Sequence, residues 1–195
     1  DRQLIASRVW RQSSLFALLR CGEAYRRASI EGERVPSTTA RLRGAAVHRA
    51  AAQGLAWQLS SQGLSAPVEL YEDVAASEID RARHGGATFT DEEHAAGQAR
   101  TWGVVKDAAV AFASTYGRVV APPLVPTHVE HRVVVADVTG LPNVTLQGTI
   151  DVTTREDDRD VIRDLKTSER APRADAAASS GQLTMYALLR SLETG

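Results

Sequence analysis

The sequence predicts an α/β (α+β) domain in which helices come first and a small sheet follows. Apolar residues recur three and four positions apart through most of residues 13–116, which is helical spacing. The stretch "APPLVP" at 121–126 then ends this pattern, and later segments alternate with a period of two, as strands do. A last helical pattern covers 180–193. This order of elements predicts an antiparallel meander flanked by helices.

Four helices are expected before the sheet, over residues 13–31, 38–64, 68–84 and 90–116. Ser13 or Ser14 can cap the first, and "GERVPS" at 32–37 breaks it. The pair Gly85-Gly86 ends the third. Thr90 and Glu93 form a capping box for the fourth.

Three strands are expected, over residues 128–138, 143–155 and 159–167. Asp157 and Asp158 can form a two-residue hairpin loop between the last two strands. In that register Arg155 faces Asp160, Ile150 faces Leu165, and Asp151 faces Asp164. A loop of three or four residues would shift the register and separate these pairs.

Two carboxylates directly opposite each other, Asp151 and Asp164, repel unless a cation lies between them. Lys166 follows Asp164 by two positions and therefore shares its strand face, about 6.6 Å along the strand. Carboxylate oxygens held on strands are ligands that Mg²⁺ or Mn²⁺ accepts. This pattern favours a metal site, and the alternative is an exposed hairpin with solvated charges.

Lysine is rare in this chain, which has 21 Arg and 2 Lys, Lys106 and Lys166. Arginine keeps its proton in proteins, whereas lysine is a compact charge whose pKa can move. An amine at position 166 is therefore usable beside an attacking water. The alternative is a chance departure from the arginine bias.

Length and composition favour one domain over residues 1–195, with a mainly helical part at 1–118 and the sheet and final helix at 125–195. The chain begins with Asp1 and stops just after a helical pattern, so we expect one or both ends to continue in a longer protein. No apolar run approaches the roughly 20 residues that span a bilayer, so no membrane partner is expected. Cys21 is the single cysteine, which fits a reducing, cytoplasmic location.

Positive charge is concentrated at the beginning of the chain. Residues 1–50 hold 10 Arg and 4 acids, a net charge of +6, and the remainder carries −7 of the overall −1. A basic segment of this kind is where phosphates would bind. A solvated cationic face with no partner is the alternative.

Four short motifs occur in order along the chain. They are "GAAVH" with Gly44 and His48, "GTID" with Asp151, "DLK" with Asp164 and Lys166, and "QLTMY" with Gln182 and Tyr186. Together they resemble the PD-(D/E)XK nuclease superfamily, in its RecB-like exonuclease branch, and "SSLFALLRCGEAYRR" resembles the N-terminal helix of that branch. The resemblance implies a restriction-endonuclease-like core with a central mixed sheet, preceded by an N-terminal helical region.

The resemblance also implies roles for these residues. His48, Asp151, Asp164 and the backbone carbonyl of Leu165 would ligate Mg²⁺ or Mn²⁺, Lys166 would orient or activate water, and Gln182 and Tyr186 would contact DNA. Without the resemblance, His48 is more simply a histidine satisfied within a helix bundle and Tyr186 a core aromatic. Ser179 and Gln182 could equally form a capping box.

The expected function is metal-dependent hydrolysis of DNA phosphodiester bonds. We expect an exonuclease on single-stranded ends, serving DNA repair, recombination or phage DNA processing, with a helicase or recombination protein as a possible partner. The alternative is a catalytically inactive DNA-binding or scaffold module of a larger recombination complex.

Some members of the family that the chain resembles hold an iron-sulfur cluster, and Cys21 occupies a position similar to that of their first cysteine ligand. No further cysteine follows in these 195 residues, so no cluster is expected here and Cys21 should be a buried small hydrophobe. The alternative is that the chain stops before the remaining ligands.

Overall fold

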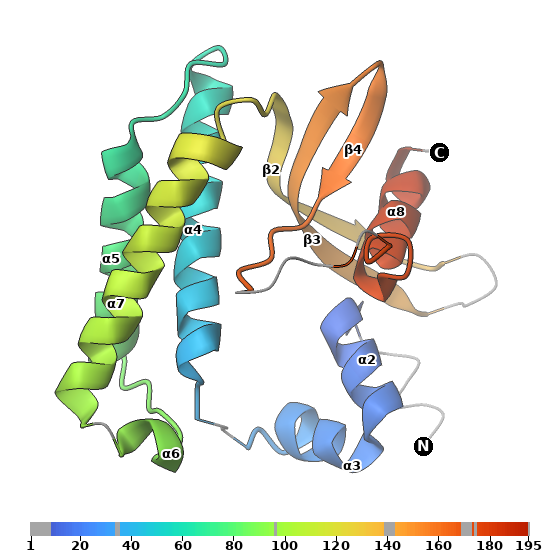
Figure 1. Cartoon of the computed structure of the whole chain (residues 1–195). Coiled ribbons are helices and arrows are strands. Elements are labelled where there is room, and N and C mark those ends of the chain that lie inside the picture. The colour runs from blue at the N-terminus through green and yellow to red at the C-terminus, as the bar shows by residue number, and fades with distance from the viewer. Residues whose placement is uncertain are drawn as a thin grey trace. The chain divides into compact units, whose positions relative to one another are not determined.

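A computed structural model describes residues 9–33, 36–95, 97–138, 143–168, 173 and 175–194. These residues form the predicted α/β arrangement of helices and a small mixed sheet (Figure 1). In chain order the elements are β1 (Val9–Arg11), α2 (Gln12–Arg20), α3 (Gly22–Tyr25), η1 (Arg26–Ile30), α4 (Thr39–Ser60), α5 (Val68–His84), α6 (Asp91–His94), α7 (Gln98–Thr115), η2 (Tyr116–Val120), β2 (Pro126–Val135), β3 (Thr145–Glu156), β4 (Arg159–Arg163) and α8 (Gly181–Thr194).

The chain divides into two compact units. The first unit comprises Asp1–Val35, Glu130–Ile150 and Arg170–Gly195, and the second comprises Pro36–Val129 and Asp151–Glu169. The boundaries fall inside β2 and inside β3, so both strands contribute residues to both units. The helices α4, α5 and α7 belong to the second unit, and α2 and α8 belong to the first.

The sheet has the strand order β1-β3-β2, and β4 pairs with β3. β1 runs parallel to β3, from Val9 opposite Thr145 to Arg11 opposite Gln147. β4 runs antiparallel to β3. The sheet is therefore mixed, as the resemblance implied. β1 itself was not predicted, because three residues, "VWR", are too few to show a period of two.

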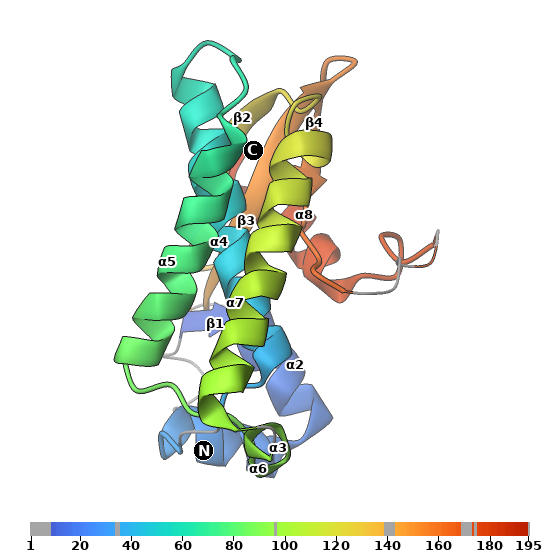
Figure 2. The same cartoon turned by 60° about the vertical axis from the view of Figure 1, so that its left-hand side comes forward.

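Two predicted helices form close to their expected bounds. Thr38 caps α4, its hydroxyl accepting a hydrogen bond from the Arg41 N–H at 3.2 Å. α5 covers the predicted 68–84 and its C-cap is Gly85. The alanine-rich sequence of α4 allows close packing, and α4, α5 and α7 lie side by side in both views (Figures 1 and 2). Among the described residues, no helix is long and apolar enough to cross a membrane.

The single long helix predicted over 90–116 is wrong. The capping box of Thr90 and Glu93 forms, but it begins only the four-residue α6. Gly97 then adopts a φ of 88°, outside the helical region, and α7 begins at Gln98. Glu93 also accepts a hydrogen bond from the Thr39 N–H at 2.9 Å, so its carboxylate holds the start of α4 as well.

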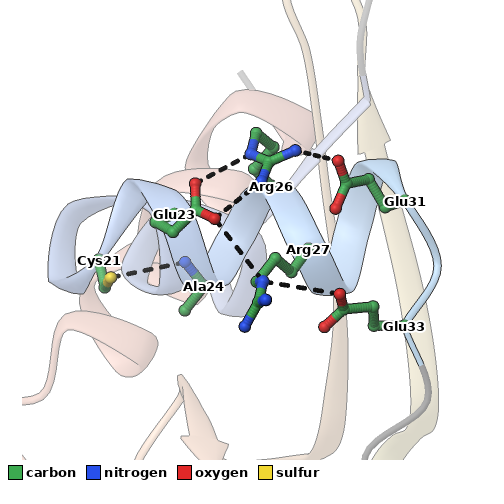
Figure 3. A network of polar contacts seen from close by, with 7 residues as sticks. All are labelled: Cys21, Glu23, Ala24, Arg26, Arg27, Glu31 and Glu33. Atoms are coloured by element: carbon green, nitrogen blue, oxygen red, sulfur yellow. Dashed lines mark hydrogen bonds and ion pairs between the residues drawn. The ribbon is translucent and has the colours of Figure 1, made fainter.

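The first predicted helix is interrupted at Cys21, whose φ of −160° is extended. Cys21 is exposed, so the expectation of a buried cysteine is wrong. Its sulfur accepts a hydrogen bond from the Ala24 N–H at 3.5 Å and caps α3 (Figure 3). The adjacent ion pairs of Arg26 and Arg27 with glutamates are solvent-exposed and contribute little to stability (Figure 3).

In the cores of both units, glycine residues allow a large side chain to lie directly against the backbone. In the second unit, Tyr71 is buried, and a Cβ at Gly54 would lie 2.1 Å from its ring while a Cβ at Gly117 would lie 2.6 Å away. In the first unit, a Cβ at Gly148 of β3 would lie 2.7 Å from Leu189 of α8. The Gly54 contact joins the consecutive helices α4 and α5, whereas the Gly117 and Gly148 contacts join elements far apart in the sequence.

We predict that Gly54→Ala lowers the free energy of unfolding by roughly 1–3 kcal/mol, because the new methyl group overlaps the Tyr71 ring in a closely packed core. Gly103→Ala in α7 is the matched control, since no atom lies within 4 Å of the added Cβ. It should raise stability by up to about 1 kcal/mol through helix propensity. Chemical denaturation measures both, and equal effects at the two positions would contradict this packing.

Candidate active site

The β3–β4 hairpin closes with the predicted two-residue loop. Asp157 and Asp158 adopt φ angles of 44° and 62°, as the favoured tight hairpin turns require. Glu156 pairs with Arg159 and Arg155 with Asp160, which confirms the predicted register. Arg155 Nη1 also donates to Asp160 Oδ1 at 3.0 Å.

The strand predicted to continue to residue 167 ends at Arg163. The last ladder pair is Val152 opposite Arg163, so Asp151 and Asp164 come next in each chain direction. At this point the backbone pairing of β3 and β4 ends, and a side-chain contact replaces it: the Leu165 N–H donates to Asp151 Oδ2 at 2.9 Å. Leu165 therefore does not pair with Ile150 as expected. The segment 164–168 nonetheless stays attached to β3 through this bond.

Asp151 joins this segment to α4. Its side chain is 17% exposed, and Oδ2 lies 3.4 Å from His48 Nδ1. Hydrogen bonding to Asp151 raises the pKa of His48, against the opposing effect of burial. His48 is thus held beside a carboxylate, and the plainer interpretation, a histidine satisfied only among helices, does not describe it.

Asp164 is the most buried acid of the group, with a side chain that is 5% exposed. Its Oδ2 lies 2.5 Å from Lys166 Nζ, and the Lys166 side chain is 55% exposed. Its Oδ1 is buried and accepts no hydrogen bond within the part of the chain that the structure describes. A buried carboxylate oxygen without a donor is unfavourable, and a cation would relieve it.

Gly44 explains the spacing of "GAAVH". A Cβ at Gly44 would lie 3.1 Å from Thr167 Oγ1, so glycine lets segment 164–168 approach α4. His48 is four residues later, on the same helix face. Arg43 Nη2 also donates to the Thr167 carbonyl at 3.5 Å. Arg43 was not predicted, and nothing in its local sequence distinguishes it from other arginines.

The donor set suits a hard divalent cation. Magnesium commonly binds one or two carboxylates and completes its shell with water and substrate phosphate oxygens. Asp151 and Asp164 supply carboxylates. Among the described residues Asp164 Oδ1 accepts no hydrogen bond, so this oxygen is available to coordinate such an ion. Within the described ranges no three His, Cys, Asp or Glu side chains are grouped to hold a metal ion, and this holds for the expected ligands His48, Asp151 and Asp164 as well. An ion bound there would draw these side chains together and take water and substrate oxygens as further ligands.

Gln182 and Tyr186 belong to the first unit and lie one turn apart on α8. Gln182 Nε2 donates to the Tyr186 hydroxyl at 2.9 Å, and Tyr186 is mostly buried. α8 begins at Gly181, so the residue directly before the helix is Ser180 and not the suggested Ser179. The Ser180 hydroxyl accepts from the Leu183 N–H at 3.2 Å, and the Ser179 hydroxyl donates to the Asp175 carbonyl.

Comparison with known families decides the assignment. The family model of the PD-(D/E)XK nuclease superfamily matches residues 10–194. The chain belongs to this superfamily. The PD-(D/E)XK assignment confirms the superfamily predicted from the four motifs, and the mixed α/β architecture is consistent with the restriction-endonuclease-like fold. Membership indicates a metal-dependent nuclease. Searches of curated proteins and of solved structures gave no match for this chain.

The hairpin that carries Asp151 and Asp164 depends on positive φ angles in its loop. We predict that Asp158→Gly raises the free energy of unfolding by roughly 0.5 kcal/mol, because glycine adopts this conformation without strain. Asp158→Val should lower it by about 1–2 kcal/mol, since a β-branched residue resists it. Urea denaturation of the two variants provides the measurement. Stability that is unaffected by either change would show that the turn is not formed.

Proposed function

We propose that this PD-(D/E)XK protein is a RecB-like exonuclease that hydrolyses DNA phosphodiester bonds from single-stranded ends with Mg²⁺ or Mn²⁺. The observation that carries the proposal is the contact between the nearly buried Asp164 and Lys166. A carboxylate and an amine held together beside Asp151 match the "GTID" and "DLK" motifs residue by residue. Repair, recombination or phage DNA processing would supply such ends.

In the proposed mechanism, the side chains divide between binding the cation and handling the phosphate. Asp151, Asp164, His48 and the Leu165 carbonyl would hold the ion. When bound, a divalent cation would polarise the phosphoryl group and lower the pKa of a nucleophilic water. The Lys166 ammonium, positioned by Asp164, would orient that water and offset the negative charge that develops on the phosphoryl oxygens.

The contacts of the Asp151 carboxylate support this division of roles. The Leu165 N–H and His48 both contact Asp151 Oδ2, which fixes the orientation of that carboxylate. Fixed ligands need no reorganisation when substrate arrives, and this is a main source of electrostatic catalysis. Gln182 and Tyr186, together with the basic first fifty residues, would contact the DNA strand.

We predict that Lys166→Ala lowers the rate of cleavage at least about 100-fold, because it removes a charge that acts in the transition state. The chain offers a matched control in its other lysine. Lys106 pairs with Asp80 at 2.6 Å on the helical surface, and Lys106→Ala should cleave at the wild-type rate. The assay follows labelled linear and circular DNA, single- and double-stranded, with Mg²⁺, Mn²⁺ or EDTA.

The substrates separate the candidate functions. Degradation of linear single strands in metal, and of no substrate in EDTA, supports the exonuclease. Cleavage of circular DNA would instead indicate an endonuclease. Salt-sensitive DNA binding with no cleavage would identify the inactive DNA-binding module. Metal-dependent cleavage that survives in Lys166→Ala would contradict the role given to this amine.

A further inference from the structure

The segment at residues 164–168 carries both Asp164 and Lys166 but belongs to no strand. β4 ends at Arg163, and the segment lies beyond the last ladder pair of that strand. In Figure 1 the chain after β4 runs toward α4. The Lys166 side chain is 55% exposed, which is too much for packing alone to fix its position. The place of the Lys166 amine therefore depends on what holds the backbone of residues 164–168.

Two contacts hold this backbone, one on each side of Lys166. Before it, the Leu165 N–H donates to Asp151 Oδ2 at 2.9 Å. After it, the Thr167 carbonyl accepts a hydrogen bond from Arg43 Nη2 at 3.5 Å. The first contact joins the segment to β3, and the second joins it to α4. Lys166 is thus the residue between two held neighbours, and the loss of either contact would release one side of it.

The guanidinium of Arg43 is itself held in place. Its Cζ lies 4.9 Å from the centroid of the Phe112 ring of α7, which is the range of a cation–π contact. A donor–acceptor distance of 3.5 Å is long, so the direction of the guanidinium depends on this stacking as much as on the hydrogen bond. A planar guanidinium can stack through its face and donate through its edge at the same time, whereas an ammonium has no such plane.

Thr167 also lies against the next residue of α4. A Cβ at Gly44 would lie 3.1 Å from Thr167 Oγ1, so the bare helix backbone and the Arg43 side chain meet the same residue. His48 of this helix lies 3.4 Å from the Asp151 carboxylate. One helix therefore contacts both the carboxylate of β3 and the segment that follows β4.

We propose that Arg43 is a positioning residue: through the Thr167 carbonyl it fixes the backbone that carries Lys166, and so keeps the amine beside Asp164. In this role it contacts neither the cation nor the phosphate. This role rests on the proposed function for the part that Lys166 plays in cleavage. An arginine that only packs α4 against α7 would instead affect stability and leave turnover by the folded protein unchanged.

Replacement of Arg43 by methionine tests this role, because it keeps a long apolar side chain against Phe112 and removes the charge and the donors. Arg118→Met is the matched control, since Arg118 Nη2 also lies 3.5 Å from its acceptor, Glu72, and its side chain is 65% exposed. Cleavage of labelled single-stranded DNA in Mn²⁺ gives kcat and KM. Arg43→Met should lower kcat about 10- to 100-fold and leave KM within about twofold, because a misplaced group costs rate rather than affinity. Arg118→Met should change neither.

Combination with Lys166→Ala separates positioning from packing. If Arg43 acts through Lys166, Arg43→Met should lower the residual single-turnover rate of Lys166→Ala by less than about twofold. An equal loss in both backgrounds would show that Arg43 acts independently of this amine, and would overturn the positioning role. A raised KM with unchanged kcat would identify Arg43 as a DNA-binding residue and would overturn it as well.

Hydrogen exchange at the Leu165 N–H reports on the same contact without activity. Arg43→Met should speed this exchange at least about tenfold relative to Arg118→Met, because the segment opens more often when one of its contacts is lost. Phe112→Leu removes the ring but keeps the guanidinium, so it should change kcat and the exchange rate in the same directions by smaller factors. It replaces Arg43→Met in both measurements if that variant does not fold.

The two measurements distinguish the positioning role from the proposed function. If the wild type cleaves DNA while Arg43→Met and Phe112→Leu keep the wild-type kcat, the positioning role is overturned and the proposed function stands. If the wild type does not cleave but Leu165 exchanges faster in these variants, the hold of Arg43 on the segment stands and the catalytic proposal fails. Unchanged exchange in both variants overturns the positioning role whether or not the wild type cleaves.

Discussion

The hydrogen bond from the Leu165 N–H to Asp151 is the contact on which the arrangement of the candidate active site depends. It forms where the β3–β4 ladder ends, and it replaces the backbone pair that a longer strand would have made. The segment after β4 thereby stays next to β3 while its side chains leave the alternation of a strand. The Lys166 side chain can then contact the Asp164 carboxylate. In a regular strand these two side chains would stand apart along the strand axis.

This geometry was partly predictable from the sequence. Asp157 and Asp158 lie between two alternating segments, and the loop length alone fixes which residues face each other, so the register was predicted correctly. The end of β4 could not be predicted. The Leu165 N–H has two possible acceptors, a strand carbonyl or a carboxylate, and the choice depends on where α4 places His48 beside Asp151. That placement is a tertiary property.

The same distinction applies elsewhere in the chain. Helices with clear caps, such as α4 and α5, were predicted because their signals are local. The break at Gly97 and the exposure of Cys21 depend on a backbone conformation that local periodicity does not reveal. β1 is too short for any pattern, yet its pairing with β3 sets the start of α2 beside Gln147. The four family motifs identified the chemistry without reference to the fold.

Anomalous scattering from crystals grown with Mn²⁺ would locate the bound ion without reference to activity. We expect one strong peak in contact with the carboxylates of both Asp151 and Asp164, with the Lys166 amine adjacent. Carboxylates that point apart with no peak between them, in crystals where Mn²⁺ is bound elsewhere, would contradict this expectation.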